Sequence, residues 1–379
     1  MDNQFSLLAA IRYFGWGGLG KLRLILDELP NARVTLYGNA RITGLTKELL
    51  GSHHKFSERA PEQANVALVI NDAGVANKIA SLNVPVVYVD SLPWLRKTDS
   101  EIPALDKIAY YCGQKYPAEM MPLANPSLRN WPGVRWIDPI VPAARIRRGG
   151  RGIVINVGGL HSYDISGIDH ELVEAAADAY LKLVVFPLAG FLQASGRKVS
   201  AVCGNLRPDD CARIRSLLPA CDDIGPQTPY AFERTLMDAD LLITSPGSTT
   251  ILQAMLAGLP ALLLPPQVTS QIYNARFYSR PGAEIPYWPE KMLDIEKIEE
   301  ARTKGLVAVT SHVYRAIVDA AASPQLSDEV AAAIRRTLEN APADGVLNQG
   351  LLALGAAGAS QVAALIKQAM ILRAGNSGD

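Results

Sequence analysis

The stretch that decides the fold is Ser245-Pro246-Gly247-Ser248-Thr249-Thr250-Ile251-Leu252-Gln253-Ala254-Met255-Leu256-Ala257-Gly258-Leu259-Pro260, which has an apolar run on each side. The run before it, 241–244, has the length of a buried parallel strand, and Pro246-Gly247 breaks it. A helix is predicted from about Thr250 to Ala257, because Gly258 and Pro260 are usual just beyond a helix end. Since the run 261–264 begins another strand, the pattern predicts an α/β fold.

Small hydroxyl residues fill the turn between the first strand and this helix. Ser248, Thr249 and Thr250 stand where the helix begins, so their hydroxyls and the first backbone N–H groups can face one anion. Together with Gly247 they predict a diphosphate site at the carboxyl edge of a parallel sheet, where such folds bind ligands. The alternative is a strand and a helix with ordinary caps and no ligand.

The same stretch resembles the donor-nucleotide motif of GT-B fold nucleotide-sugar glycosyltransferases, especially the peptidoglycan lipid-intermediate and macrolide glycosyltransferases. Their pattern is G-(A/S)-x-T-x-x-E-(A/x)-x-x-x-G-x-P, and this chain departs from it at Gln253, where those enzymes use a glutamate to hold the ribose. An amide can still accept one hydrogen bond and donate another. Downstream, Gln271-Ile-Tyr-Asn274-Ala275 resembles the same families' Q-x-x-N-A, whose amides meet the transferred sugar.

The resemblance implies an α/β GT-B architecture, in which two Rossmann-like domains face each other across a cleft. A chain of 379 residues is also too long for one ordinary core. The segment 138–152 is rich in proline, then in arginine and glycine, and reads as a linker. We therefore expect an acceptor domain over 1–145, a donor domain over 146–355, and a C-terminal helix within 356–379 that returns to the first domain.

Composition narrows the function classes. Lysine plus arginine equals aspartate plus glutamate at 37 each, so no net charge attracts nucleic acid. No apolar run approaches the ~20 residues of a membrane span, and the acidic start Met1-Asp2 is unlike a signal peptide. The expected location is cytoplasmic. The four cysteines lack metal-ligand spacing, so no metal cofactor is expected.

Two further glycine turns are candidates for ligand contact. Gly15-x-Gly17-Gly18-x-Gly20 follows the strand 6–11 and formally matches a dinucleotide fingerprint, although the next strand does not end in the acid that would bind a ribose. In GT-B terms, the backbone of Gly17 and Gly18, with Lys21, approaches the sugar or its phosphates; Lys21 would otherwise be a solvated helix residue. The resemblance likewise implies that Gly158 and Gly159 face the donor phosphates, and His161 follows them.

The predicted catalytic base is Asp90. In the peptidoglycan enzyme a G-G-H motif brings a histidine to the cleft, but this chain has Leu19 at that place. Asp90 ends the strand 84–90 in the domain expected to hold the acceptor, and a carboxylate there can take a proton from the nucleophile. Asp72, after another strand, is the next candidate. Each aspartate would otherwise cap the segment that follows it.

These features together predict a glycosyltransferase of the hexosyltransferase class that moves a sugar from a UDP-sugar to a small-molecule acceptor. More loosely, the segment 15–23 and the G-S-T-T turn resemble cytosylglucuronic acid synthases of nucleoside antibiotic biosynthesis, which join cytosine to the glucuronic acid of UDP-glucuronate. Lys21, Arg12 or Arg23 would then bind a carboxylate. Trp16 or Trp94 would stack on the base.

Three alternatives remain open at this stage. The same fold serves nucleotide-sugar epimerases and hydrolases, which normally show cleft acids and histidines that the recognisable loops here lack. An NADP-dependent oxidoreductase would rest on Gly15 to Gly20, with Arg41 as a phosphate partner. A non-catalytic nucleotide-binding subunit is the third. The oligomeric state is not predicted.

Overall fold

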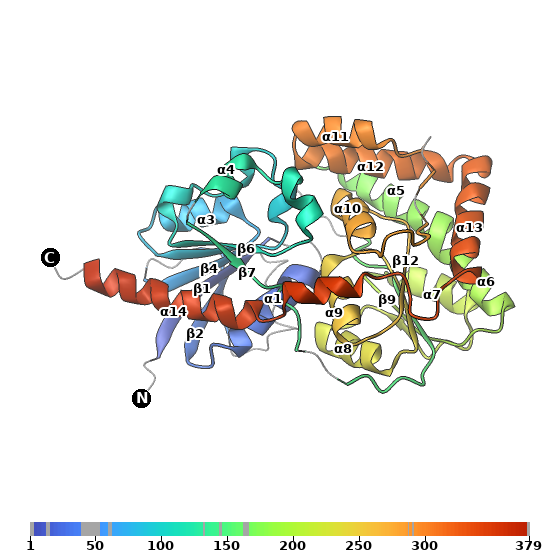
Figure 1. Cartoon of the computed structure of the whole chain (residues 1–379), viewed down its shortest axis with the longest axis horizontal. Coiled ribbons are helices and arrows are strands. Elements are labelled where there is room, and N and C mark those ends of the chain that lie inside the picture. Colours follow the sequence, from blue (N-terminus) through green and yellow to red (C-terminus); the bar gives the residue numbers. More distant parts are fainter. Residues whose placement is uncertain are drawn as a thin grey trace. The chain divides into compact units, whose positions relative to one another are not determined.

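The computed structural model describes residues 4–12, 16–38, 54–59, 63–131, 133–143, 146–161, 167–286, 288–289 and 292–376. The chain forms two compact units, and each is described by itself. The first unit combines Met1–Pro142 with Ala353–Asp379, and the second is Ala143–Leu352. Figure 1 follows the chain by colour from one unit into the other and back.

The first unit is built on a parallel sheet with the strand order β3-β2-β1-β4-β5-β6-β7. Its elements in chain order are β1 (Phe5–Ile11), α1 (Trp16–Asp27), β2 (Ala32–Tyr37), β3 (Lys55–Ser57), β4 (Val66–Ile70), α3 (Ala73–Ala80), β5 (Val86–Asp90), the 3-10 turns Pro93–Leu95, Asp99–Glu101 and Leu105–Lys107, β6 (Tyr110–Gln114), the 3-10 turn Ala118–Leu123, α4 (Pro126–Asn130), β7 (Val134–Ile137) and α14 (Gly358–Asn376). Strands β1, β4, β5 and β6 are nearly continuous in buried residues, as expected where helices cover both faces of a parallel sheet, whereas β2, β3 and β7 are only partly buried or exposed.

Alternation along the strands divides the first core in two. Leu7 and Ala9 of β1 face one cluster, whereas Leu8 and Ala10 face the other. The first cluster is completed by α1 and by Val362 and Ile366 of α14, and the second by α3. The C-terminal helix therefore covers one face of this sheet beside α1, as Figure 1 shows.

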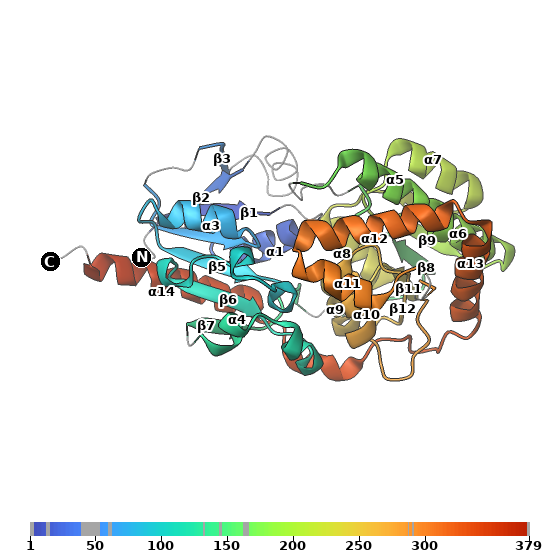
Figure 2. The ribbon, with the colours of Figure 1, turned by 90° about the horizontal axis from the view of Figure 1, so that it is seen from above.

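The second unit repeats the plan with a smaller parallel sheet, in the order β10-β9-β8-β11-β12. Its elements are β8 (Ile153–Asn156), α5 (His170–Tyr180), a π-helical segment (Leu181–Val185), α6 (Phe186–Ala194), β9 (Val199–Cys203), α7 (Pro208–Leu217), β10 (Asp223–Gly225), α8 (Pro229–Asp238), β11 (Leu241–Thr244), α9 (Ser248–Leu256), β12 (Ala261–Leu263), α10 (Thr269–Phe277), α11 (Ile295–Thr303), α12 (Leu306–Ala321) and α13 (Pro324–Glu339), followed by the 3-10 segment Gln349–Leu354. Figure 2 shows α12 running alongside α5, which it contacts along its length. Two Rossmann-like α/β sheets are thus present, as the sequence predicts.

Several elements differ from the sequence-based expectation. The short strands β3 and β10 have three residues each, too few to show a period of two. Helix α9 begins at Ser248, two residues before the predicted start. Helix α1 begins at Trp16, so Gly17 and Gly18 lie in its first turn rather than in a loop before it. Glycine is a poor helix former, which conceals a helix start from pattern reasoning.

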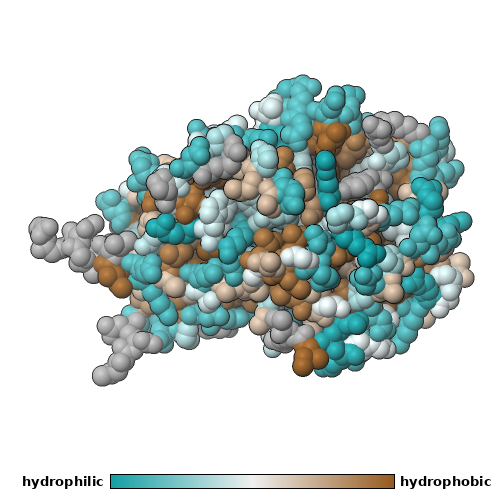
Figure 3. All heavy atoms as spheres, viewed as in Figure 1, coloured by the Kyte–Doolittle hydropathy of each residue, from teal (hydrophilic) through white to brown (hydrophobic). Residues whose placement is uncertain are grey.

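In the part of the chain that the structure describes, two helices are long and apolar enough to cross a membrane by length and composition alone, His170–Ala194 and Gln349–Ile371. The first is mostly buried within the unit, as a core helix is. The second includes most of α14, whose Val362 and Ile366 pack into the first core. On the face drawn in Figure 3, hydrophobic side chains are interspersed with hydrophilic ones. These features do not show a membrane span.

Candidate functional site

The second sheet has a topological switch point between β8 and β11. The chain leaves β8 toward β9 and β10 on one side, then returns to build β11 and β12 on the other. In open α/β sheets, ligands bind at the carboxyl ends of the strands that flank such a point. The turns in question are 156–161, after β8, and 245–247, after β11. Three of the predicted donor-binding residues lie in these turns, Gly158, Gly159 and Gly247. Three more, Ser248, Thr249 and Thr250, follow the second turn directly.

The turn after β11 presents the start of α9. Gly247 is the N-cap and supplies no side-chain cap, while its own N–H bonds to the Ser245 carbonyl at 2.7 Å. The first bond of the helical ladder runs from the Ile251 N–H to the Gly247 carbonyl, so the N–H groups of 248–250 stand ahead of that ladder. A Cβ placed at Gly247 would meet no other heavy atom within 4 Å in the described chain. At Gly247, the N-cap of this helix, the backbone therefore borders open space, and the positive end of a helix suits a phosphate.

The turn after β8 lies close against the turn after β11. Gly158 has φ +68°, and an added Cβ would lie 3.2 Å from Ser245 Oγ, so glycine is required there. The Gly158 carbonyl accepts from the Asn205 N–H at 3.0 Å. Gly159 is exposed on the same turn. The structure thus brings Gly158 and Gly159 to the same sheet edge as Gly247 to Thr250.

Asn156 joins these two turns, and sequence reasoning did not single it out. It is the last residue of β8 and is buried. Its Oδ1 accepts from the Gly158 N–H at 3.1 Å, and its Nδ2 lies 3.1 Å from Thr244 Oγ1 and 3.4 Å from Thr250 Oγ1. An asparagine at the end of an apolar strand is the only signal that the sequence offers.

The two amides of the Q-x-x-N-A motif lie on α10 and are buried. Gln271 is 9% exposed, and its Oε1 accepts from the Gln267 N–H at 2.8 Å. Asn274 is 2% exposed, and its Nδ2 donates to the Pro246 carbonyl at 2.9 Å. Each amide hydrogen-bonds to the backbone of a nearby turn, Gln271 at Gln267 and Asn274 at Pro246. The geometry therefore gives both residues a role in fixing these turns, in addition to the sugar contact that the motif implies. Gln253 is half-buried on α9, one turn beyond Thr249 and Thr250 and on their face.

His161 ends the β8 turn but points into the protein. It is buried, with Nδ1 3.1 Å from Glu174 Oε2 and Nε2 3.1 Å from Asp210 Oδ2. Burial, reinforced by the Arg207 guanidinium, lowers the pKa of His161 in spite of the Asp210 carboxylate. The imidazole therefore ties the turn to α5 and α7 rather than facing a ligand.

The remaining predicted residues lie in the first unit. Gly17 and Gly18 form the first turn of α1, and Lys21 follows on the same helix. Lys21 is only 5% exposed, and burial lowers the pKa of its amine to about 8. Solvation of Lys21 on a helix face, the alternative stated above, is thus wrong. Gly15 and Arg41, on which the oxidoreductase alternative depends, lie outside the described residues.

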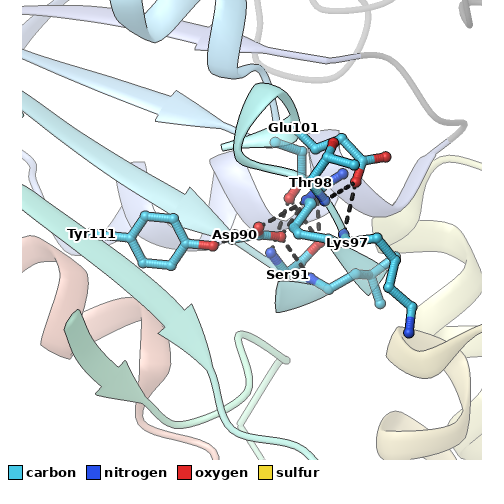
Figure 4. A network of polar contacts seen from close by, with 9 residues as sticks. Asp90, Ser91, Lys97, Thr98, Glu101 and Tyr111 are labelled. Carbon is cyan, nitrogen blue, oxygen red and sulfur yellow. Dashed lines mark hydrogen bonds and ion pairs between the residues drawn. The ribbon is translucent and has the colours of Figure 1, made fainter. Parts of the chain in front are cut away.

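Asp90 lies at the end of β5 with no exposed surface. Figure 4 shows it between Tyr111 and the segment that follows it. Arg96 donates to both carboxylate oxygens, from Nε at 2.9 Å and from Nη2 at 3.1 Å. The Tyr111 hydroxyl donates at 2.7 Å and the Leu92 N–H at 3.0 Å.

This geometry favours a structural role for Asp90 over the predicted role as a base, because every acceptor position is used inside the protein. Burial and the same carboxylate raise the pKa of Tyr111. Asp72 caps α3 by accepting from the Val75 N–H at 2.9 Å. This is the capping role stated above as the alternative to a catalytic one. Trp94 is 1% exposed, so the expectation that it stacks on a ligand base is wrong.

Among the described residues, no group of three or more histidine, cysteine, aspartate or glutamate side chains could hold a metal ion. The candidate site in the second unit is therefore made of backbone N–H groups, hydroxyls and amides. Such a site can hold an anion through dipoles alone.

Comparison with solved structures gives distant similarities across almost the whole chain. A UDP-glucosyltransferase from Polygonum tinctorium is 12% identical, with a TM-score of 0.48 and coverage of 97% of this chain and 100% of that one. MurG of Acinetobacter baumannii is 12% identical, with a TM-score of 0.46 and coverage of 96% and 99%. The glycotransferase of kitacinnamycin is 13% identical, with a TM-score of 0.45 and coverage of 98% and 100%. Curated proteins gave no match.

A family model matches the part of the chain that carries the candidate site. Residues 227–311 match the glycosyltransferase family 28 C-terminal domain. The matched range contains the turn after β11, all of α9 and the amides of α10. The chain therefore carries a glycosyltransferase family 28 C-terminal domain and is a glycosyltransferase.

Proposed function

We propose that the chain transfers a sugar from a UDP-sugar to a small-molecule acceptor, and that the donor diphosphate binds at the start of α9. One observation carries this proposal: the helix begins at a glycine that faces open space, beside a second glycine turn at the switch point of the sheet. Gly247, Ser248, Thr249 and Thr250 supply the diphosphate contacts, and Gly158 and Gly159 approach from the other turn.

The site suits the chemistry of a leaving diphosphate. When the bond from the anomeric carbon to the diphosphate breaks, negative charge grows on the phosphate oxygens. Backbone N–H groups and a helix N-terminus that already point at those oxygens stabilise the charge without reorganising. The proposed reaction needs no metal ion. Gln253 stands near the ribose, where it can exchange hydrogen bonds with the hydroxyls.

The narrower proposal is transfer of glucuronic acid from UDP-glucuronate to cytosine. It rests on the resemblance of the segment 15–23 and the G-S-T-T turn to cytosylglucuronic acid synthases. Lys21 would be the partner of the sugar carboxylate. Its amine carries its charge below a pKa of about 8, so it can pair with a carboxylate at neutral pH.

A ligand panel tests the broad proposal. Melting temperature is measured with UDP, UDP-glucuronate, UDP-glucose and NADPH, since a ligand at 100 Kd stabilises by about 2.7 kcal/mol. Stabilisation by UDP compounds is expected. Stabilisation by NADPH alone would favour an oxidoreductase instead.

An activity assay tests the narrower proposal. The protein is incubated with UDP-glucuronate and cytosine, and the products are identified by mass spectrometry. We expect UDP and a cytosine–glucuronic acid adduct in equal amounts. Release of UDP with free glucuronic acid, whether or not cytosine is present, would favour a hydrolase, and a new UDP-sugar would favour an epimerase.

A further inference from the structure

A third segment contacts both turns of the candidate site, the turn after β8 and the turn after β11. It is the turn after β12, and its Gln267 is 6% exposed. The Gln267 side-chain nitrogen, Nε2, donates to the Val157 carbonyl at 2.5 Å and to Ser245 Oγ at 2.7 Å. Val157 belongs to the turn after β8, and Ser245 begins the turn after β11. One NH₂ group therefore bridges the turns on both sides of the switch point.

The backbone that carries this amide is itself fixed. The Tyr180 hydroxyl donates to the Pro265 carbonyl at 2.7 Å, and Trp288 Nε1 donates to the Pro266 carbonyl at 2.6 Å. The Gln267 N–H donates to Gln271 Oε1 at 2.8 Å. Three consecutive residues are thus anchored to α5, to the segment around Trp288 and to α10. Gln267 has little freedom to follow the turns if they move.

We propose that Gln267 is a positioning residue, which sets the distance between the two turns that receive the donor diphosphate. This inference rests on the proposed function of the same site. The side chain is too buried to contact the ligand and acts through the backbone at Val157 and the hydroxyl of Ser245. Because the proposed diphosphate lies against both turns, a small change in their separation weakens its binding.

The chemistry of the amide makes the inference testable at one position. Both bonds are donated by the NH₂ group, and a glutamate of the same shape has no hydrogen to donate. Gln267→Glu can still accept a bond from the Ser245 hydroxyl, but it places a carboxylate against the Val157 carbonyl. Gln267→Met removes both bonds and keeps the length of the side chain. Either variant breaks the bridge.

The experiment compares two ligands that differ only in the diphosphate. Dissociation constants for UDP and uridine are measured by titration calorimetry for the wild type and both Gln267 variants. We expect the Kd for UDP to rise about tenfold or more while the Kd for uridine stays within about twofold. A merely structural loss would not separate the two ligands.

A matched control removes a similar bond from the opposite edge of the sheet. Ser200 Oγ donates to the Ile153 carbonyl at 3.1 Å, at the amino end of β8, and is buried. Ser200→Ala should lower the melting temperature but leave both dissociation constants unchanged. If the Gln267 variants fold poorly, Ser245→Ala, which removes one acceptor of the bridge, is measured in the same way.

Two outcomes overturn the inference. In folded variants, a UDP affinity equal to that of the wild type shows that the bridge does not position the turns. A parallel loss for UDP and uridine shows that Gln267 acts on the whole domain. A wild type that binds uridine and UDP equally well instead removes the diphosphate site, and with it the proposed function.

Discussion

The Asn274 side-chain amide donates a 2.9 Å hydrogen bond to the Pro246 carbonyl. This bond joins the two motifs that resemble a donor site, one on α10 and the other before α9. Pro246 directly precedes Gly247, so the amide holds the backbone from which the phosphate turn starts. Asn274 Oδ1 finds no hydrogen-bond partner among the described residues.

Removing this bond should weaken nucleotide binding. Asn274→Ala is expected to raise the Kd for UDP by about fivefold to tenfold, because the Pro246 carbonyl loses its donor and the turn gains freedom. Asn274→Asp should lose more, since a carboxylate faces that carbonyl. Calorimetric titration with UDP measures both, and Asn340→Ala, at the exposed end of α13, is the control. Unchanged UDP affinity with slower turnover would instead indicate that Asn274 acts on the transferred sugar and not on the phosphate turn.

Gly247→Val should block the phosphate without harming the fold. The backbone there has φ −76° and ψ 126°, which valine adopts readily, and its Cβ meets open space. We expect the Kd for UDP to rise at least about tenfold at nearly constant unfolding free energy. Gly190→Val, at an exposed position of α6 that is also open, is the matched control and should leave the affinity unchanged. A folded Gly247→Val protein with wild-type affinity would place the diphosphate elsewhere.

Much of the fold follows from local patterns in the sequence. The runs 66–70 and 86–89 indicate parallel strands directly, because both faces of each strand are buried and no charged residue interrupts them. The turn before α9 was also predictable, since Gly247 and three hydroxyl residues occupy a helix start. The short strand β10 and the early start of α1 were not, because three residues or a glycine pair carry too little pattern.

The supporting residues of the site could not be predicted. Asn156, Gln267 and His161 act through contacts with residues about 10 to 110 positions away in the chain. Nothing near Asp90 in the sequence shows that Arg96 turns back to it, or that Tyr111 of the next strand donates to it. Long-range pairing decides whether a polar residue at a strand end faces a ligand or the core.

Lys21 should make stability depend on pH in the alkaline range. Its pKa is lowered from 10.5 to about 8 by burial, so the native state releases this proton before the unfolded state does. The unfolded chain then binds more protons between about pH 8 and 10.5, and the Lys21 contribution to stability rises over this interval. Below pH 8 the cost of burying the charge is fully present. Over the interval the shift corresponds to about 3 kcal/mol.

Urea denaturation of the wild type and Lys21→Met at pH 7, 8, 9 and 10 measures this dependence. The methionine variant should exceed the wild type in unfolding free energy by the largest amount at pH 7, and this difference should shrink as the pH rises. Lys182→Met, which replaces an exposed lysine of the π-helical segment, is the control. It shows how much of the pH dependence comes from removing any lysine rather than the buried Lys21. A constant difference across the four pH values would show that Lys21 does not titrate in this range.

Asp90→Asn separates a structural role from a catalytic one. The substitution removes the charge opposite Arg96, whose side chain is 7% exposed, and a buried ion pair that loses one partner costs about 3–5 kcal/mol. We therefore expect a large fall in unfolding free energy by urea denaturation. Asp72→Asn is the matched control, because asparagine caps a helix as well as aspartate does. If Asp90→Asn keeps wild-type stability and UDP affinity but transfers sugar about 10²–10⁴-fold more slowly, Asp90 is the base after all.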